Sequence, residues 1–459
     1  MTDRNNLTAR AAAWQALNQC DILRHDTAAI LNRLLSRTDR PAQAADIVFG
    51  VIRSRGTLDY ILKKYSKTDS SRVKTAAWNL LRIAVYELIY APKTADYAIV
   101  NEAVQLARDA ESAKLAGFIN AVLRNVQRAV ESRLAPLQTE SLRRMIPQTT
   151  QSGCLFADNL LPDPVKETTQ YFSTAFSLPQ DLVNTWLKTY GPEQTRMLCF
   201  ASNRHPSIIV QPNILLVTAA ELAQRLAADS VQTEMKAGVL RIRSTGRINT
   251  YPSYLEGLFY IQDTAAFDAI ALAHPQSQWA ALDLCAAPGG KCITLAMLTR
   301  DAGTILASDS STQRLQMVRQ NIQRLRLQSV KVIPGGHIHA EVRRQKTLNL
   351  IILDVPCSNT GVLARRIEVR WRWKPRQIES LQQMQRRLLE QAVQLAGPET
   401  KILYSTCSIQ PEENQHQIAA FLAEHRRFAL EAEKLTLPAV ESEQAFDHDG
   451  AYSALLRPK

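Results

Sequence analysis

The sequence predicts a multi-domain fold: an all-helical N-terminal domain, a small α+β unit and a C-terminal α/β domain with a mostly parallel sheet. Three observations support this fold class. Residues 1–135 carry apolar residues at three- and four-residue spacing, residues 169–265 mix strand-like runs with helices, and residues 266–459 alternate strands with helices. The chain has 459 residues, which is enough for several such cores.

The N-terminal domain is predicted as a series of consecutive helices. "AQAADIVFGVIRSRGTLDYILKKY" and "VKTAAWNLLRIAVYELIY" keep the helical spacing over their full length. The last segment, "LAGFINAVLRNVQRAV", is amphipathic, with arginines on its polar side. It is either a packing module or a basic surface that binds RNA or protein.

A change of composition separates this domain from the next. Residues 136–168 are polar, contain prolines and have no sustained period, so we expect a linker there. In residues 169–265, "SIIVQPNILLV", "GVLRIRS" and "GLFYIQD" indicate strands, and "TAAELAQRLAAD" indicates a helix between them. These elements predict a small α+β subdomain.

Composition limits the partners and the compartment. The formal net charge of +12 favours a polyanion, above all a nucleic acid, although a basic surface without a specific role is the alternative. No apolar run can span a bilayer and no secretory signal begins the sequence, so we expect a cytoplasmic protein without a membrane partner. The seven cysteines are widely spaced and form no C-x-x-C pair, which argues against a disulfide framework or a structural zinc site.

A glycine-containing turn opens the C-terminal domain. "CAAPGGK" follows the buried strand "WAALDLC" and leads into a helix, but it has neither the Walker A nor the G-x-G-x-x-G spacing. Its small residues allow a ligand to approach the backbone beside a helix N-terminus. Asp309 ends the next strand, where an acid can accept both ribose hydroxyls or cap the following helix. These features together fit S-adenosylmethionine.

Two cysteines follow two later strands. Cys357 lies after "LNLIILDV" and Cys407 after "KILYST", just ahead of a helix N-terminus that favours a thiolate. A lone cysteine near a sheet is more often packing, but two at adjacent strand ends indicate chemistry. His337 and His339 are available, yet their spacing matches no zinc pattern.

A methyl donor beside two cysteines indicates methylation of cytosine at C5. A thiolate that adds to C6 makes C5 able to attack a methyl sulfonium, and the adduct resolves when C5 loses its proton. Asp354, next to the cysteine turn, is placed to hydrogen-bond N3 and N4 of the base.

These motifs resemble the RNA cytosine-C5 methyltransferases of the Nop/Sun type, through "LDLCAAPGGK", "DVPCSNTGV" and "STCSIQPEEN". The N-terminal domain resembles a NusB-like RNA-binding domain, through "DIVFGVIRSRGTLDYIL", "LLRIAVYELIY" and "GFINAVLRNV". The resemblance covers nearly the whole chain except the stretch near 131–168. It implies a Rossmann-like, S-adenosylmethionine-dependent catalytic domain that acts on small-subunit ribosomal RNA, and we expect a monomer without a metal.

The resemblance also implies roles for individual residues. Cys407 is expected to be the nucleophile, Cys357 to assist product release and Asp354 to activate the cytosine. Contacts with the methyl donor or the reacting base are expected from Cys285, Ala286, Ala287, Pro288, Gly289, Gly290, Lys291, Asp309 and Asp354.

The site departs from the family pattern in two places. Val355 and Asn359 replace small residues in the Cys357 turn, which predicts a narrower pocket. Gly335, Gly336 and His337 stand where the family has an acid, which predicts weaker donor binding or another group in that contact.

The segment "ARRIEVRWRWKPR" at 364–376 combines arginines with two tryptophans, which suits phosphates and stacked bases. The alternative is a solvated helical face. The residues expected to bind RNA are Arg365, Arg366, Arg370, Trp371 and Arg372.

Two other functions remain open. A catalytically impaired RNA-binding or ribosome-assembly protein could keep the fold, and the missing acid supports it. The same chemistry could also act on transfer RNA. Both cysteines, Asp354 and the glycine turn favour the enzyme, because a scaffold needs none of them, and the NusB-like domain favours the ribosomal substrate.

Overall fold

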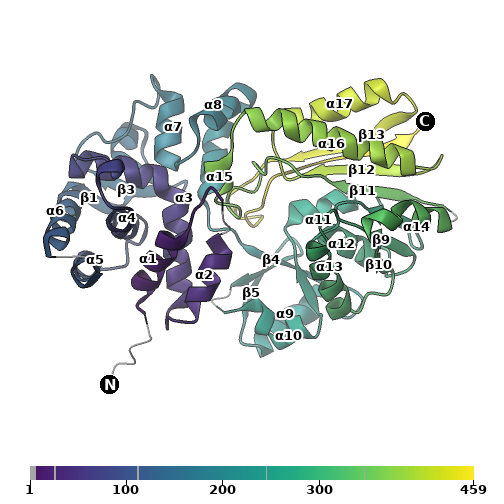
Figure 1. Ribbon diagram of the computed structural model, residues 1–459, viewed down its shortest axis with the longest axis horizontal. Helices are drawn as coiled ribbons and strands as arrows, with labels where there is room; N and C mark the ends of the chain where they lie inside the picture. The colour runs from purple at the N-terminus through teal and green to yellow at the C-terminus, as the bar shows by residue number, and fades with distance from the viewer. Residues whose placement is uncertain (1–6, 25–26, 111–112, 244–245, 346) are drawn as a thin grey trace. The chain divides into compact units, whose positions relative to one another are not determined.

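The computed structural model describes residues 7–459 except 25–26, 111–112, 244–245 and 346. The chain forms two compact units (Figure 1). The first comprises Met1–Arg204 with Arg366–Lys374, and the second comprises His205–Arg365 with Pro375–Lys459. Among the described helices, none is long and apolar enough to cross a membrane.

Helices dominate the first unit, as the sequence predicts. They are α1 (Ala9–Gln19), α2 (Thr27–Leu35), α3 (Pro41–Ser66), η1 (Ser70–Arg72), α4 (Thr75–Tyr90), α5 (Asp96–Ala110), α6 (Ala113–Ala129), α7 (Thr168–Phe176), α8 (Gln180–Asn203) and α15 (Val369–Arg372). Helix α4 is buried on nearly every side, because its sequence is apolar almost throughout. Asp59 of α3 accepts hydrogen bonds from Trp78 and Arg82 of α4 and joins the two helices.

The linker expected at 136–168 is corrected by the structure. A three-stranded antiparallel sheet of order β1-β3-β2 occupies much of it, with β1 (Val130–Pro136), η2 (Thr139–Arg144), β2 (Met145–Pro147) and β3 (Ser152–Phe156). Arg133 of β1 donates to the carbonyl of Leu88 in the last turn of α4 and to that of Ala91, the residue after this helix. The sequence pattern missed these strands because they are short and tertiary contacts hold them.

The middle subdomain begins later than expected. Helices α7 and α8 lie almost entirely within the residues assigned to the middle subdomain, 169–265, but they fall in the first unit. The expected α+β elements follow in the second unit as a sheet of order β5-β6-β4-β7. They are β4 (Ile208–Pro212), α9 (Ala219–Ala228), β5 (Gln232–Lys236), β6 (Val239–Arg243), η3 (Ile248–Thr250), α10 (Pro252–Leu255) and β7 (Phe259–Ile261).

The C-terminal domain contains a seven-stranded sheet of order β10-β9-β8-β11-β12-β14-β13, in which the last two strands pair antiparallel. Its strands are β8 (Ala280–Asp283), β9 (Thr304–Ala307), β10 (Val330–Val332), β11 (Leu350–Asp354), β12 (Lys401–Thr406), β13 (Phe428–Thr436) and β14 (Ala451–Pro458). Its helices are α11 (Thr264–Ala271), α12 (Gly290–Leu298), α13 (Thr312–Leu325), η4 (Gly335–His337), α14 (Ile338–Arg344), α16 (Arg376–Leu395), η5 (Pro411–Glu413) and α17 (Gln415–Glu424).

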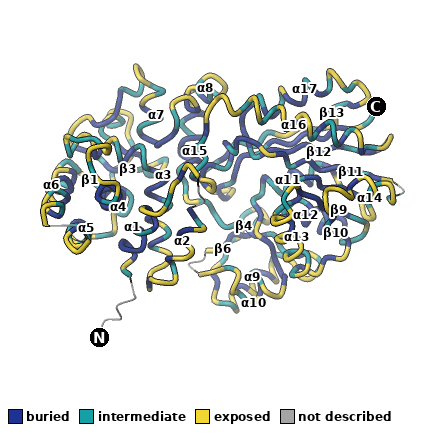
Figure 2. Tube along the Cα trace, in the orientation of Figure 1, coloured by how far each residue is buried: buried dark blue, intermediate teal, exposed yellow. Residues whose placement is uncertain are grey.

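Strand β11 lies at the centre of this sheet and is buried on both faces (Figure 2). Leu350 and Ile352 pack in one core cluster, whereas Ile351 and Leu353 pack in the other, as the two-residue period of a strand requires. The strand order reverses between β8 and β11, and ligands of such sheets bind at this switch point, outside the carboxyl ends of the strands.

Candidate active site

Four strand ends bring the predicted site residues to one edge of the sheet. Strands β8, β9, β11 and β12 are parallel neighbours, so their carboxyl ends meet at the same edge. Asp283, Ala307, Asp354 and Thr406 are the last residues of these four strands. The glycine turn, Asp309, Cys357 and Cys407 therefore lie in loops that leave this edge.

The two cysteines are in contact. The Sγ atoms of Cys357 and Cys407 are 3.2 Å apart, and Cys407 Sγ lies 3.1 Å from the amide oxygen of Asn359. Cys357 is buried, whereas Cys407 is partly exposed. The hydrogen bond with Cys407 and then burial raise the pKa of Cys357, so that side chain is a thiol at neutral pH. Cys407 is thus the cysteine that a substrate can reach.

Asn359 links the two cysteine loops. Its backbone is left-handed, with φ 58°, a conformation that asparagine tolerates better than most residues. Its Nδ2 donates to the carbonyl of Cys357 at 2.7 Å, while its Oδ1 faces the Cys407 thiol. The Asn359 side chain, which is larger than the family's residue at this position, therefore bonds to both cysteine residues. Val355 packs in a core cluster of the sheet, where its bulk fills protein interior.

Glu413 is a buried carboxylate that ties the same two loops together. Its Oε1 accepts from the Ser358 backbone N–H at 2.9 Å and from Gln385 Nε2 at 3.0 Å. Its Oε2 accepts from the hydroxyls of Ser358 and Ser408. The sequence indicated only a helix start at this residue. Each cysteine is followed by a serine, Ser358 or Ser408, and this repeated hydroxyl could have indicated a common hydrogen-bond acceptor such as Glu413.

Glu413→Gln should lower the free energy of unfolding by about 2 kcal/mol, because hydrogen bonds to a buried charged acceptor contribute roughly 1.5–3 kcal/mol. Glu379→Gln, at an exposed glutamate of α16, is the matched control and should change little. Urea unfolding of both variants measures the difference. If the two variants were equally stable, the claim that Glu413 holds the two cysteine loops together would be wrong.

Lys291 forms an ion pair with Asp354, the predicted catalytic acid. Its Nζ lies 2.8 Å from Asp354 Oδ1. Burial disfavours the ammonium, but the charges of Asp354 and Asp283 outweigh it and raise the pKa of Lys291. Lys291 is therefore a fixed positive charge, and it orients the Asp354 carboxylate, which remains partly exposed.

Asp283 is buried beneath this pair at the end of β8. Burial, and next the charge of Asp354, raise its pKa to about 7. Its Oδ1 accepts from the Cys285 backbone N–H at 3.2 Å, whereas its Oδ2 has no hydrogen-bond partner among the described residues. A pKa of about 7 means that Asp283 is mostly protonated below that pH and mostly ionised above it.

This shift predicts a pH dependence of stability. Because Asp283 binds its proton more tightly when folded than when unfolded, folding loses stability as pH rises from about 4 to about 7. Asp283→Asn cannot ionise, so its melting temperature relative to the unmodified chain should rise by a few degrees between pH 5 and pH 8. Asp39→Asn, at an exposed aspartate, is the control. A difference that stays constant across this range would contradict the prediction.

The glycine turn forms a small cradle in front of α12. Gly289 has φ 115°, in the range that favours glycine, and a Cβ on Gly290 would lie 3.3 Å from Gln262 Nε2. The Ala287 backbone N–H donates to Asp309 Oδ2 at 3.2 Å. Burial, followed by the charge of Asp283, raises the pKa of Cys285, so this cysteine is an unreactive thiol.

The Asp309 carboxylate is already hydrogen-bonded to groups of the protein. Its Oδ1 accepts from the Ser311 backbone N–H at 2.9 Å and from Arg314 at 2.6 Å. The carboxylate is only 1% exposed, and Arg314 covers it. A ribose could use this acid only if Arg314 gave up its hydrogen bond. Gly335, Gly336 and His337 are exposed in the η4 turn after β10, with no acid among them.

The basic segment at 364–376 is mostly structural, which corrects part of the predicted RNA interface. Arg370 is 1% exposed and donates to the carbonyls of Arg53 and Ser202, so it is not available to RNA. Burial, and then the charge of Arg53, lower its pKa to about 9. Arg370 is buried because the carbonyls of Arg53 and Ser202, inside the first unit, need hydrogen-bond donors.

Neighbouring residues of the segment also bond to protein. Trp371 Nε1 donates to the Ile52 carbonyl at 3.0 Å, and Arg372 Nε donates to the Ile22 carbonyl at 2.8 Å. Arg365 belongs to the second unit, where it pairs with Asp263 and Asp449. Arg366 is exposed, and its contact with RNA stays a prediction.

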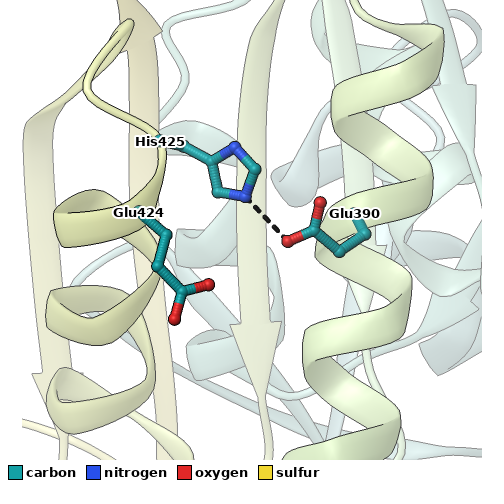
Figure 3. A group of neighbouring side chains, drawn as sticks. All are labelled: Glu390, Glu424 and His425. Atoms are coloured by element: carbon teal, nitrogen blue, oxygen red, sulfur yellow. Dashed lines mark hydrogen bonds and ion pairs between the residues drawn. The ribbon is translucent and has the colours of Figure 1, made fainter.

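One group in the described part of the chain has spacing suited to a metal: Glu390 of α16 with Glu424 and His425 at the end of α17 (Figure 3). His425 Nε2 already lies 2.7 Å from Glu390, and its ring stacks on Phe421. Glu424 pairs with Arg386 at 3.4 Å. These contacts explain why the three side chains lie close together, and the explanation needs no metal ion.

Comparison with known proteins identifies the class and then the family. Residues 269–451 match the family described as 16S rRNA methyltransferase RsmB/F, and residues 7–128 match the NusB family. The chain is 30% identical to the "Probable ribosomal RNA small subunit methyltransferase B" of Synechocystis, over 94% of this chain and 93% of that protein.

A further relative and a solved structure are also similar to the chain. The "Ribosomal RNA small subunit methyltransferase B" of Yersinia pseudotuberculosis is 28% identical over 92% of this chain and 91% of that protein. The crystal structure of a protein called PH0851 has the same fold, with a TM-score of 0.74, 21% identity and coverage of 98% of both chains.

The fold and these matches define an RNA methyltransferase. The chain belongs to the RsmB/F family of 16S rRNA methyltransferases and carries a NusB-family domain at its N-terminus. The predicted family resemblance, helical NusB-like domain and Rossmann-like catalytic domain are thereby confirmed.

Proposed function

We propose that this enzyme transfers a methyl group from S-adenosylmethionine to C5 of a cytosine in 16S ribosomal RNA, through a covalent adduct between Cys407 and C6. The observation that carries the proposal is the contact of Cys357 and Cys407, 3.2 Å apart at the ends of neighbouring strands. The family and its named relatives support ribosomal RNA as the substrate.

The residues at the switch point fit the methyl donor. Gln262 Nε2 is buried without a hydrogen-bond partner among the described residues and lies beside Gly290 of the cradle. The α12 N-terminus offers backbone N–H groups to a carboxylate such as that of methionine. Residues 285–291 would hold the donor, with Asp309 for the ribose once Arg314 moves. When bound, the donor supplies an electrophilic methyl group.

The chain's own groups account for the remaining steps. The Cys407 thiolate adds to C6 and forms a C–S bond, which makes C5 nucleophilic. The Asp354 carboxylate accepts a hydrogen bond from the exocyclic amine of cytosine, and the Lys291 charge offsets the negative charge that develops on the ring. After methyl transfer the C5 proton passes to solvent water, the C–S bond breaks, and its electron pair leaves with Cys407, which becomes a thiolate again. Cys357 is close enough to exchange a proton during this release.

Incubation of the chain with methyl-labelled S-adenosylmethionine and unmodified 16S ribosomal RNA tests the proposal. Label is expected at C5 of cytosine, located by digestion to nucleosides and mass spectrometry. Label in transfer RNA alone would redirect the same chemistry to the alternative substrate. Absence of label in both RNAs would support an impaired RNA-binding protein instead.

A further inference from the structure

The two cysteines of the site lie close enough for a modification that methyl transfer does not use. All seven cysteines of the chain are free thiols in the structure. The Sγ atoms of Cys357 and Cys407 are 3.2 Å apart. A disulfide bond is about 2.05 Å long, so an approach of roughly 1 Å would join the two sulfurs. The pair is therefore placed for oxidation to a disulfide.

The main chain around the pair fits such a bond. Strands β11 and β12 are parallel neighbours with Asp354 opposite Ser405, and such strands lie about 4.8 Å apart, within the Cα separations that a disulfide spans. The Val355 N–H donates to the Ser405 carbonyl at 3.0 Å, and the Gly361 N–H donates to the Cys407 carbonyl at 3.0 Å. These hydrogen bonds hold the two loops together, so the sulfurs can meet by rotation of the two side chains.

The two thiols differ in what can reach them. Cys407 is partly exposed, whereas Cys357 is 8% exposed. Cys407 also interacts electrostatically with the Lys291 ammonium, and a cysteine beside a cation is more reactive toward oxidants. An oxidant from solvent thus meets Cys407 first. Cys357 lies next to it as a resolving thiol, an arrangement that is frequent in cysteines that respond to peroxides.

We propose that Cys357 and Cys407 form a reversible oxidation site for hydrogen peroxide, and that the resulting disulfide stops methyl transfer. The Cys407 sulfur attacks one peroxide oxygen, the O–O bond breaks, and the thiol proton leaves with the departing hydroxide as water. The Cys357 sulfur then attacks the Cys407 sulfenic acid, so that the S–S bond forms and the S–O bond breaks. The Cys357 proton leaves with this hydroxide as a second water. The two thiols together lose two electrons and two protons, which reduce one peroxide to two waters.

Oxidation of Cys407 also prepares Cys357 for its step. The hydrogen bond with Cys407 is the first cause that raises the pKa of Cys357. A neutral sulfenic acid carries no negative charge, so the Cys357 thiol loses its proton more readily once Cys407 is oxidised. A dithiol reductant would reverse the disulfide by thiol–disulfide exchange at the exposed Cys407 sulfur. The loss of activity rests on the proposed role of Cys407 as nucleophile, whereas the disulfide rests on the contact of the two sulfurs.

Treatment of the full chain with hydrogen peroxide, in the absence of RNA, tests the site. Methyl transfer to 16S ribosomal RNA should then fall about tenfold or more, because an oxidised Cys407 cannot add to C6, and dithiothreitol should restore it. Mass spectrometry of peptides prepared without reductant should show Cys357 joined to Cys407 with the loss of two hydrogen atoms. Cys20→Ala, which removes a partly exposed cysteine outside the site, is the control and should respond like the unmodified chain.

Cys357→Ala keeps Cys407 but removes its partner. Peroxide should convert Cys407 of this variant to a sulfinic acid that dithiothreitol does not reduce, whereas the unmodified chain should be protected by its disulfide. Sulfinic acid at Cys407 of the unmodified chain, without a linked peptide or recovery of activity, would overturn the site. Full methyl transfer by the linked chain would overturn the switch. A linked peptide that dithiothreitol cleaves, in a chain that transfers no methyl group to RNA, would support the site while the proposed reaction fails.

Discussion

Cys407→Ala should lower methyl transfer by about 10⁴-fold or more, because removal of a covalent nucleophile leaves only binding and electrostatic contributions. The structure favours Cys407 over Cys357 for this role, since Cys407 is partly exposed and Cys357 is a buried thiol of raised pKa. The rate of label transfer from S-adenosylmethionine to 16S ribosomal RNA at saturating donor measures the effect.

The control for this variant is Cys20→Ala. Cys20 is a partly exposed cysteine of the first unit whose Sγ contacts the Thr27 hydroxyl, outside the cysteine site. It should keep full activity. Residual turnover of Cys407→Ala above about one per cent of the control, or accumulation of a covalent complex in Cys407→Ala, would reverse the roles of the two cysteines.

Cys357→Ala should trap the enzyme on its RNA. With Cys407 intact, addition to C6 and methyl transfer can proceed, but the proton exchange that assists release is lost. The covalent complex should therefore accumulate to a large fraction of the enzyme, whereas the unmodified chain should show almost none. Denaturing gel electrophoresis with labelled RNA detects the complex as a band of reduced mobility.

The double variant Cys357→Ala/Cys407→Ala separates covalent trapping from tight binding. It should give no retarded band, because the C–S bond requires Cys407. A retarded band in the double variant would mean that another residue holds the RNA. Rapid turnover by Cys357→Ala, without any trapped complex, would show that the buried thiol is dispensable for release.

Much of the site could be predicted from local sequence because parallel strands deliver their carboxyl ends to one edge. Asp354, Cys357 and Cys407 each follow a short apolar run, so their place at that edge followed once the strands were recognised. The helical N-terminal domain followed in the same way from its apolar spacing. These features depend on neighbours close in the chain, and periodicity reports such neighbours well.

Other features depended on residues far apart in the sequence. The strands within 136–168 are held by contacts such as that of Arg133 with the end of α4, which no local pattern contains. Arg370 was expected at a surface, but three-dimensional packing makes it a buried donor to backbone carbonyls. The charge of a side chain identifies its chemistry and leaves its partner undetermined.

The sequence by itself therefore determined the fold class and the family and predicted the reactive groups, since these depend on residue type and spacing along a strand or helix. Only the tertiary structure decided which thiol is accessible, that Asn359 and Glu413 join the two cysteine loops, and that burial raises the pKa of Asp283 at the end of β8. Exposure, hydrogen-bond partners and pKa values follow from distances between segments that meet only when the sheet has formed.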